Sequence, residues 1–219
     1  MSTLIHEPQE KADACIIWMH GLGSNAQDMM GLAHALRLKH AVRHVSLQAP
    51  MQRVTVNNGM MMPAWYDITG VKLTDREDSA GICKSEAVIG EVIASEIKKG
   101  IAPEHIFLAG FSQGGAMALF TGLQLSEPLG GIIVLSAYLP MALQCNIRLN
   151  RKTPIFMALG EHDPIVLPGW TRQAVLMLKD KGFSSLSLKA YPMEHAVCAE
   201  EISDLSLWLT TQLTRKESE

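Results

Sequence analysis

The segment Phe107-Leu-Ala-Gly-Phe-Ser-Gln-Gly-Gly-Ala116 constrains the fold more than any other part of this chain. Its first half is an apolar run typical of a buried strand, and its second half begins a pattern typical of a helix. Ser112 lies on the bend, with Gly110 and Gly114 two residues to either side. Side chains at those two positions would collide with neighbouring backbone. Glycine therefore permits a sharp strand-to-helix turn that projects the serine hydroxyl above a sheet.

Short β-rich segments alternate with amphipathic segments along the chain. This predicts an α/β fold with a mostly parallel central sheet and helices on both faces. Most expected strands are continuous apolar runs, as for strands covered on both faces, whereas residues 186–191 alternate and are expected near a sheet edge. The expected strands are residues 14–19, 45–49, 105–110, 131–136, 154–159 and 186–191. The expected helices are residues 27–38, 79–98 with Ser79 as N-cap, 114–125, 167–181 and 196–213.

The connection over residues 50–78 reads as irregular, and it carries Met60-Met-Met62 and Trp65-Tyr-Asp67. Long loops in compact domains are usually functional or disordered, and the apolar character of this one favours function. The chain contains no internal repeat, low-complexity tract or linker-like segment. We therefore expect a single domain over residues 1–219, with its core at about 12–213.

Composition narrows the classes of partner. The net charge is −3 and no long cluster of lysine and arginine occurs, so nucleic acid and anionic membrane surfaces are not expected partners. The longest apolar stretch, residues 130–140, is too short to span a bilayer. The four cysteines lack metal-ligand or CxxC spacing, and the N-terminus lacks the pattern of a secretory signal. These features predict a cytoplasmic protein without an integral membrane segment.

A serine hydroxyl becomes a nucleophile when a histidine accepts its proton and a carboxylate orients the histidine. In one large class of α/β enzymes the order along the chain is Ser, then Asp or Glu, then His. His162 and His195 are the histidines that follow Ser112, and Asp163 and His195 each follow an expected strand, where parallel sheets place their chemistry. We therefore predict Ser112 as nucleophile, His195 as general base and acid, and Asp163 as its orienting carboxylate. Carboxylates elsewhere, such as Glu127 and Asp180, are expected to be exposed, and Asp67 is expected to be a hydrogen-bonding partner within its loop.

Acyl transfer also needs two donors to the oxyanion of the tetrahedral intermediate. One is expected to be the backbone N–H of Gln113, directly after the nucleophile. The loop His20-Gly-Leu-Gly23 follows an early strand, and its glycines let backbone approach a substrate closely. The backbone N–H of Leu22 is the expected second donor.

His40 and His44 have the i, i+4 spacing that can hold a metal on a helix. They lack the glutamate of a zinc-protease helix and lie past the expected end of a helix. We interpret them as two surface histidines, and predict neither a metal nor a cofactor.

Five segments together resemble the phospholipase/carboxylesterase family, which includes the acyl-protein thioesterases. They are Ile17-Trp-Met-His-Gly-Leu-Gly23, Gln48-Ala-Pro50, Met62-Pro-Ala-Trp-Tyr-Asp67, Gly110-Phe-Ser-Gln-Gly-Gly115 and Gly160-Glu-His-Asp-Pro164. Ser24-Asn-Ala follows the first segment, and in this the chain is more similar to the bacterial carboxylesterases. The resemblance implies an α/β-hydrolase fold without a large cap domain, and no cofactor. It also implies that the triad falls on Ser112, Asp163 and His195 and the oxyanion donors on Leu22 and Gln113.

The expected function is a serine carboxylesterase acting on short- to medium-chain acyl esters. An acyl-protein thioesterase or a lysophospholipase would use the same triad, and a non-catalytic ligand-binding hydrolase fold is a third alternative. Trp65, Met62 and Leu167 are candidates for substrate binding, Trp65 because of the resemblance. The expected partner is a small acyl ester or thioester, and a monomer or a modest homodimer fits equally.

Overall fold

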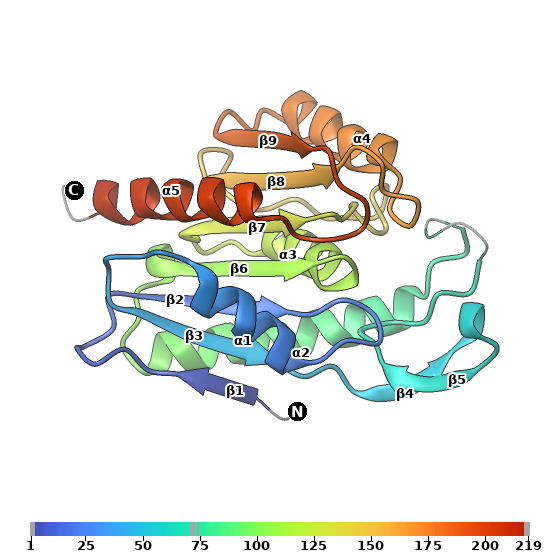
Figure 1. Ribbon diagram of the computed structural model, residues 1–219, viewed down its shortest axis with the longest axis horizontal. Coiled ribbons are helices and arrows are strands. Elements are labelled where there is room, and N and C mark those ends of the chain that lie inside the picture. Colours follow the sequence, from blue (N-terminus) through green and yellow to red (C-terminus); the bar gives the residue numbers. More distant parts are fainter. Residues whose placement is uncertain (1–2, 71–72, 74, 217–219) are drawn as a thin grey trace.

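The computed structural model describes residues 3–70, 73 and 75–216. A seven-stranded sheet forms its centre, made of β1 (Thr3–His6), β2 (Ala14–Met19), β3 (Val42–Leu47), β6 (Ile106–Phe111), β7 (Gly131–Leu135), β8 (Ile155–Gly160) and β9 (Leu186–Tyr191). The strand order is β1-β3-β2-β6-β7-β8-β9. Within the described chain, β1 is antiparallel to β3 and the other neighbours are parallel. The carboxyl ends of the parallel strands therefore lie together along one side of the sheet (Figure 1).

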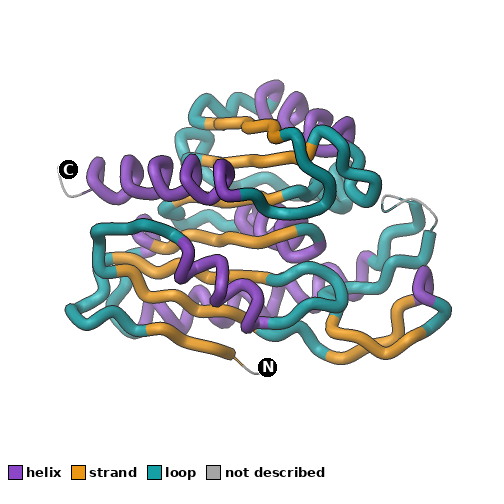
Figure 2. The backbone as a smooth tube through the Cα atoms, viewed as in Figure 1, coloured by secondary structure: helices purple, strands orange, loops and turns teal. Residues whose placement is uncertain are grey.

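Helices cover both faces of this sheet (Figures 1 and 2). One face carries α1 (Ala26–Ala35) and α5 (Ala199–Lys216), and the other carries α2 (Ser79–Lys98), α3 (Gln113–Gln124) and α4 (Pro168–Asp180). Successive residues of β2 alternate between two hydrophobic clusters. Cys15 and Ile17 pack on the side of α2, α3 and α4, whereas Ile16 and Trp18 pack on the side of α1 and α5. Burial on both faces explains the continuous apolar runs of the central strands.

The structure confirms the predicted α/β class. The strands at residues 14–19 and 186–191 and the helix at 79–98 have the predicted bounds, and β9 lies at a sheet edge as predicted. The other predicted elements are present with shifted ends. The largest shifts are of three residues. They are in β3, which begins three residues earlier than predicted, in α1, which ends three residues earlier, and in α5, which begins and ends three residues later.

The connection over residues 50–78 was predicted to be irregular, and this was wrong in part. Strands β4 (Met51–Val54) and β5 (Met60–Pro63) form an antiparallel hairpin around the short 3-10 turn Thr55–Asn57. Asn58 and Gly59 close the hairpin with positive φ of 55° and 70°. The hairpin extends beyond the carboxyl ends of the parallel strands (Figure 1).

Candidate active site

Ser112 sits between β6 and α3 with φ 53° and ψ −121°, a strained conformation that aims its side chain away from the sheet. A Cβ on Gly110 would lie 2.3 Å from the carbonyl carbon of Gly114, and a Cβ on Gly114 would lie 2.1 Å from the carbonyl oxygen of Met19. The steric reason predicted for the two glycines is therefore confirmed. The backbone N–H of Ser112 donates to Leu135 O at 2.9 Å, which ties the turn to the end of β7.

The structure brings Ser112, His195 and Asp163 into one hydrogen-bonded chain. His195 Nδ1 lies 2.7 Å from Asp163 Oδ2, and His195 Nε2 lies 2.9 Å from Ser112 Oγ. Since the carboxylate accepts from Nδ1–H, the Nε2 atom is left to accept the serine proton. These hydrogen bonds join residues at the ends of three different strands, as parallel topology allows.

Asp163 is buried, with 3% of its surface exposed. Its Oδ1 atom accepts from the backbone N–H groups of Ile165 at 2.8 Å and Val166 at 2.9 Å, so both carboxylate oxygens are bonded. The ring of Phe111 packs against the His195 imidazole with 4.7 Å between centroids. These contacts fix the carboxylate and the imidazole in one relative orientation.

The loops that carry Asp163 and His195 also contact each other directly. The backbone N–H of His162 donates to Met193 O at 3.1 Å, and that of Glu161 donates to Tyr191 O at 2.8 Å. Gly160 permits this approach, because a Cβ there would lie 2.4 Å from the carbonyl oxygen of Glu194. This role of Gly160 was missed from the sequence, although the glycine precedes the predicted acid by three residues.

The loop His20-Gly-Leu-Gly23 is held by the buried imidazole of His20. Its Nδ1 donates to Gly21 O at 2.7 Å, while its Nε2 accepts from the backbone N–H of Ala49 at 3.0 Å. Burial lowers the pKa of His20, which favours the neutral ring that this pattern requires. The backbone of Leu22 is thereby positioned beside the Ser112 turn, where both residues line one pocket.

Gln113, the residue after Ser112, bonds through its side chain to the backbone of residues 65 and 66. Its Oε1 accepts from the backbone N–H of Trp65 at 2.8 Å, and its Nε2 donates to Tyr66 O at 2.8 Å. The indole N–H of Trp65 donates to His20 O at 2.8 Å. Trp65 and Tyr66 therefore connect the loop that carries Leu22 with Gln113, the two residues whose backbone N–H groups were predicted to form the oxyanion hole.

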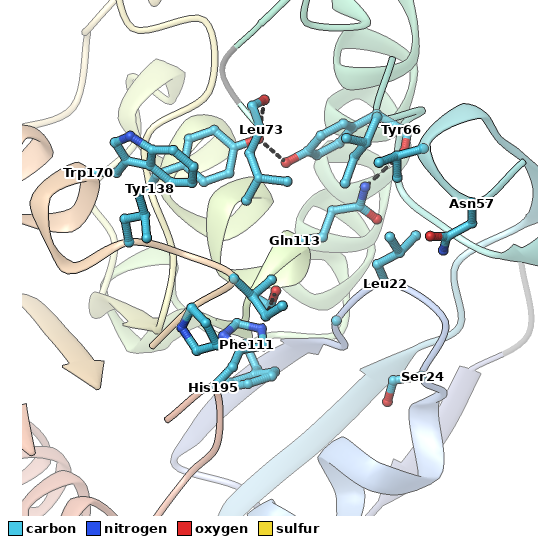
Figure 3. Close-up of a pocket in the computed structure, with 17 residues that line it drawn as sticks. Leu22, Ser24, Asn57, Tyr66, Leu73, Phe111, Gln113, Tyr138, Trp170 and His195 are labelled. Carbon is cyan, nitrogen blue, oxygen red and sulfur yellow. Dashed lines mark hydrogen bonds between the residues drawn. The ribbon is translucent and has the colours of Figure 1, made fainter. Parts of the chain in front are cut away.

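A pocket of about 700 Å³ opens above Ser112 and His195. The polar side chains of Ser24 and Asn57 lie on the same side of the pocket as Leu22, apart from each other, whereas Tyr138 and Trp170 lie toward the other end (Figure 3). The apolar side chains that line it include Leu22, Val56, Ile68, Leu73, Phe111, Ile165 and Leu167. The pocket is thus mostly apolar, with a few polar groups around the reactive chain.

The three predicted substrate-binding residues have different positions. Leu167 lines the pocket and is exposed to solvent. Trp65 is 1% exposed and points to His20, so the next residue, Tyr66, forms the pocket wall in its place. Met62 lies beside the pocket, where its sulfur accepts from Asn57 Nδ2 at 3.2 Å. Tyr66 and its partner Tyr138, with hydroxyl oxygens 3.0 Å apart, were missed from the sequence.

The other histidine and carboxylates considered from the sequence lie outside the hydrogen-bonded triad. His162, Glu127 and Asp180 are exposed. The side chain of Asp67 accepts from the backbone N–H and hydroxyl of Thr55 at 2.7 and 2.6 Å, as predicted for a loop partner.

The interpretation of His40 and His44 as surface residues was wrong for His44. This ring is buried, and its Nδ1 accepts from the indole N–H of Trp18 at 3.0 Å. Across residues 3–70, 73 and 75–216, no group of three or more His, Cys, Asp or Glu side chains is arranged to hold a metal ion. None of the helices within those ranges is both long enough and apolar enough to cross a membrane.

Comparison with known proteins shows which family and which proteins the chain is similar to. Residues 2–213 match the sequence model of the family described as Phospholipase/Carboxylesterase. Acyl-protein thioesterase 1 of Emericella nidulans is 36% identical over 216 residues, covering 91% of this chain and 90% of the relative. The protein of that name from Neurospora crassa is 37% identical over 219 residues, covering 92% and 88%. The crystal structure of Zea mays acyl-protein thioesterase 2 superposes with a TM-score of 0.85 at 26% identity, covering 97% and 99%.

Proposed function

The chain belongs to the phospholipase/carboxylesterase family, and we propose that it is a carboxylesterase that hydrolyses short- to medium-chain acyl esters through an acyl-enzyme intermediate on Ser112. As a member of this family it is a serine hydrolase acting on carboxylic ester or thioester bonds. One observation carries the narrower proposal: Ser112, His195 and Asp163 form a continuous hydrogen-bonded chain at the base of an apolar pocket.

In the proposed acylation step, His195 Nε2 removes the proton from Ser112 Oγ as this oxygen attacks the carbonyl carbon of the ester. Asp163 holds Nδ1–H and stabilises the imidazolium that forms. The backbone N–H groups of Leu22 and Gln113 are proposed to donate to the oxyanion, whose charge develops only as the tetrahedral intermediate forms. When that intermediate collapses, the imidazolium gives its proton to the departing alkoxide.

In the deacylation step, the same imidazole removes a proton from water, which attacks the acyl carbon. Collapse of the second tetrahedral intermediate releases the carboxylic acid and returns the proton to Ser112 Oγ. His20 and Gln113 act here as positioning residues, because their side chains brace the backbone that carries the two proposed donors.

We propose that the acyl chain occupies the end of the pocket at Leu73, Tyr138 and Trp170, with Leu167 beside it. This end is apolar, whereas Ser24 and Asn57 give the other end hydrogen-bonding groups that suit a polar leaving group (Figure 3). Trp65 is proposed to support the site from behind, through His20 and Gln113. Met62 is proposed to contribute through Asn57.

The decisive experiment compares the wild type with Ser112→Ala on p-nitrophenyl butyrate. Loss of the nucleophile should lower kcat by on the order of 10⁴-fold or more. Ser136→Ala serves as a control, because this buried serine has positive φ at the end of β7 but its hydroxyl makes no hydrogen bond to another described residue. Substantial activity in the Ser112 variant would contradict the role of Ser112 as nucleophile. Failure of a fluorophosphonate to label Ser112 would favour a non-catalytic ligand-binding protein.

A second candidate is an acyl-protein thioesterase, because the curated relatives carry that name. The same three residues would act, since ester and thioester cleavage both pass through a tetrahedral oxyanion. A matched pair, butyl butyrate and its S-butyl thioester, separates the candidates through their kcat/KM values. Acylated peptides and a lysophospholipid extend the comparison to the other substrates that the family description suggests.

We further propose a single domain over the whole chain that works as a monomer or a modest homodimer. A reducing compartment such as the cytoplasm is proposed because all four cysteines are free thiols in the structure. Size-exclusion chromatography with light scattering tests the oligomeric state.

A further inference from the structure

A second cavity of about 470 Å³ lies next to the catalytic pocket. Besides two aromatic side chains, its apolar lining is Leu139, Ala142, Leu143, Ala174 and Met177, and its polar lining is Glu77, Gln144 and Gln173. The two cavities have two lining residues in common, Tyr138 and Trp170. These two aromatic side chains therefore form the wall that separates the cavities.

The two halves of this wall are held differently. Tyr138 is buried, and its hydroxyl lies 3.0 Å from the Tyr66 hydroxyl and 3.2 Å from Leu73 O, so it is fixed at its far end. Trp170 is half-buried and packs edge-on against Tyr138, with 6.3 Å between ring centroids. Its indole N–H makes no hydrogen bond to another described residue. Among the described residues, the Trp170 ring is therefore held by packing rather than by a hydrogen bond.

The position of Trp170 on its helix is equally simple. It lies in the first turn of α4, after Leu167 and Pro168, and its backbone N–H donates to Leu167 O at 2.9 Å. The loop from Asp163 to Leu167 leads directly into this turn, so the acid of the reactive chain and the wall residue belong to one short segment. Changing the Trp170 side chain alters the wall without removing a hydrogen bond from the reactive chain.

We propose that Trp170 is the residue that limits acyl-chain length, and that the second cavity takes the distal methylenes of longer acyl chains when this side chain is reduced or displaced. The inference rests on the proposed function and deepens it. An acyl chain is the expected occupant because the wall stands at the apolar end of the pocket, opposite Ser24 and Asn57 (Figure 3). Leu139, Ala174 and Met177 then continue the apolar surface beyond the wall.

The test measures kcat/KM for p-nitrophenyl esters from butyrate to palmitate, kept below the concentration at which micelles form. The wild type and the Trp170→Ala and Trp170→Phe variants are compared, each normalised to its own butyrate value. In the wild type, kcat/KM should stop rising at the chain length that fills the first pocket. In Trp170→Ala the rise should continue to longer chains, by up to about fourfold for each further buried methylene. Trp170→Phe keeps an aromatic wall and should retain a profile close to that of the wild type.

A second substitution decides whether the added space is the second cavity. Ala142 lies on its exposed side, so Ala142→Trp should fill the cavity without crowding the core. The double variant Trp170→Ala/Ala142→Trp is expected to return to the shorter chain limit. Thermal unfolding of each variant shows that the fold is retained.

Several results would overturn the proposal. They are an unchanged chain-length profile in Trp170→Ala, a double variant that still accepts the longer chains, or a shift seen only when the alcohol rather than the acyl group is lengthened. None of these results affects the proposed function itself, which is tested separately by the activity of Ser112→Ala and by fluorophosphonate labelling of Ser112.

Discussion

At Gly160 the strand that leads to Asp163 passes in direct contact with the segment that leads to His195. A β-carbon at this position would lie 2.4 Å from Glu194 O and 2.5 Å from Met193 O, and both atoms belong to backbone. Backbone cannot rotate aside as a flexible side chain can. A methyl group here would therefore push the two backbone segments apart and change the distance between Asp163 and His195.

We predict that Gly160→Ala lowers kcat/KM for p-nitrophenyl butyrate by on the order of 10²-fold, because misplacing a catalytic group by about 1 Å has an effect of that size. The matched control is Gly90→Ala, in a helix where an added β-carbon meets nothing within 4 Å. That control should keep its activity and gain roughly 0.5–1 kcal/mol of stability from the higher helix propensity of alanine. Equal activity in the two variants would show that Gly160 does not set the contact between the loops.

Individual residues also mark what the sequence could reveal about the site. Order along the chain selected Ser112, Asp163 and His195, which the structure joins by hydrogen bonds, since parallel strands end at one edge. Trp65 and Tyr66 show where such reasoning stops. Neighbouring side chains in an extended segment point in opposite directions, and the sequence does not indicate which of the two faces the pocket.

Among the elements, α2 provides a direct test of sequence against structure. Ser79 was predicted as its N-cap, and this was wrong by one residue. Asp78 is the N-cap, with its Oδ1 accepting from the backbone N–H of Gly81 at 2.9 Å and its Oδ2 accepting from that of Asp67 at 3.0 Å. Both residue types are common caps, so composition alone could not choose between them.

We predict that Asp78→Ala lowers the free energy of unfolding by about 1–2 kcal/mol, because the variant loses the cap and leaves the Asp67 N–H without its acceptor. Ser79→Ala should change it by less than about 0.5 kcal/mol, since that side chain is exposed within the first turn. Urea unfolding of both variants measures the difference. A larger loss for Ser79→Ala than for Asp78→Ala would contradict the assignment of the cap.

Two parts of the sheet were missed from the sequence, for different physical reasons. The early part of β3 contains Arg43 and His44, which read as loop residues. Both are buried because Arg43 pairs with Glu96 at 2.7 Å and His44 bonds to Trp18. All four residues of the edge strand β1 are exposed, so it lacks the alternation that marks a half-buried strand. Neither the long-range partners of β3 nor a fully exposed strand can be identified from local sequence patterns.

At the scale of the whole molecule, one acidic side chain is buried without a hydrogen-bond partner among the described residues. Glu201, in the first turn of α5, has no exposed surface, and neither carboxylate oxygen has a hydrogen-bond partner among the described residues. Burial raises its pKa from the ordinary value of 4.5 to about 8, an effect that the nearby Cys198 backbone N–H only partly opposes. The folded protein therefore holds a proton here that the unfolded chain has already released at neutral pH.

This acid gives the stability of the molecule a pH dependence of defined sign. Between about pH 4.5 and 8 the folded state binds more protons than the unfolded state, so the free energy of unfolding falls as the pH rises. Glu201→Gln removes the ionisation, and we predict that it is more stable than the wild type at pH 9, with an upper bound of roughly 5 kcal/mol. The advantage should shrink toward pH 5, where the wild-type carboxyl is protonated. Glu200→Gln, at the exposed neighbouring position, should follow the wild type in thermal unfolding across this range. If the Glu201 variant also ran parallel to the wild type, the carboxyl would have to be ionised in the folded protein at neutral pH.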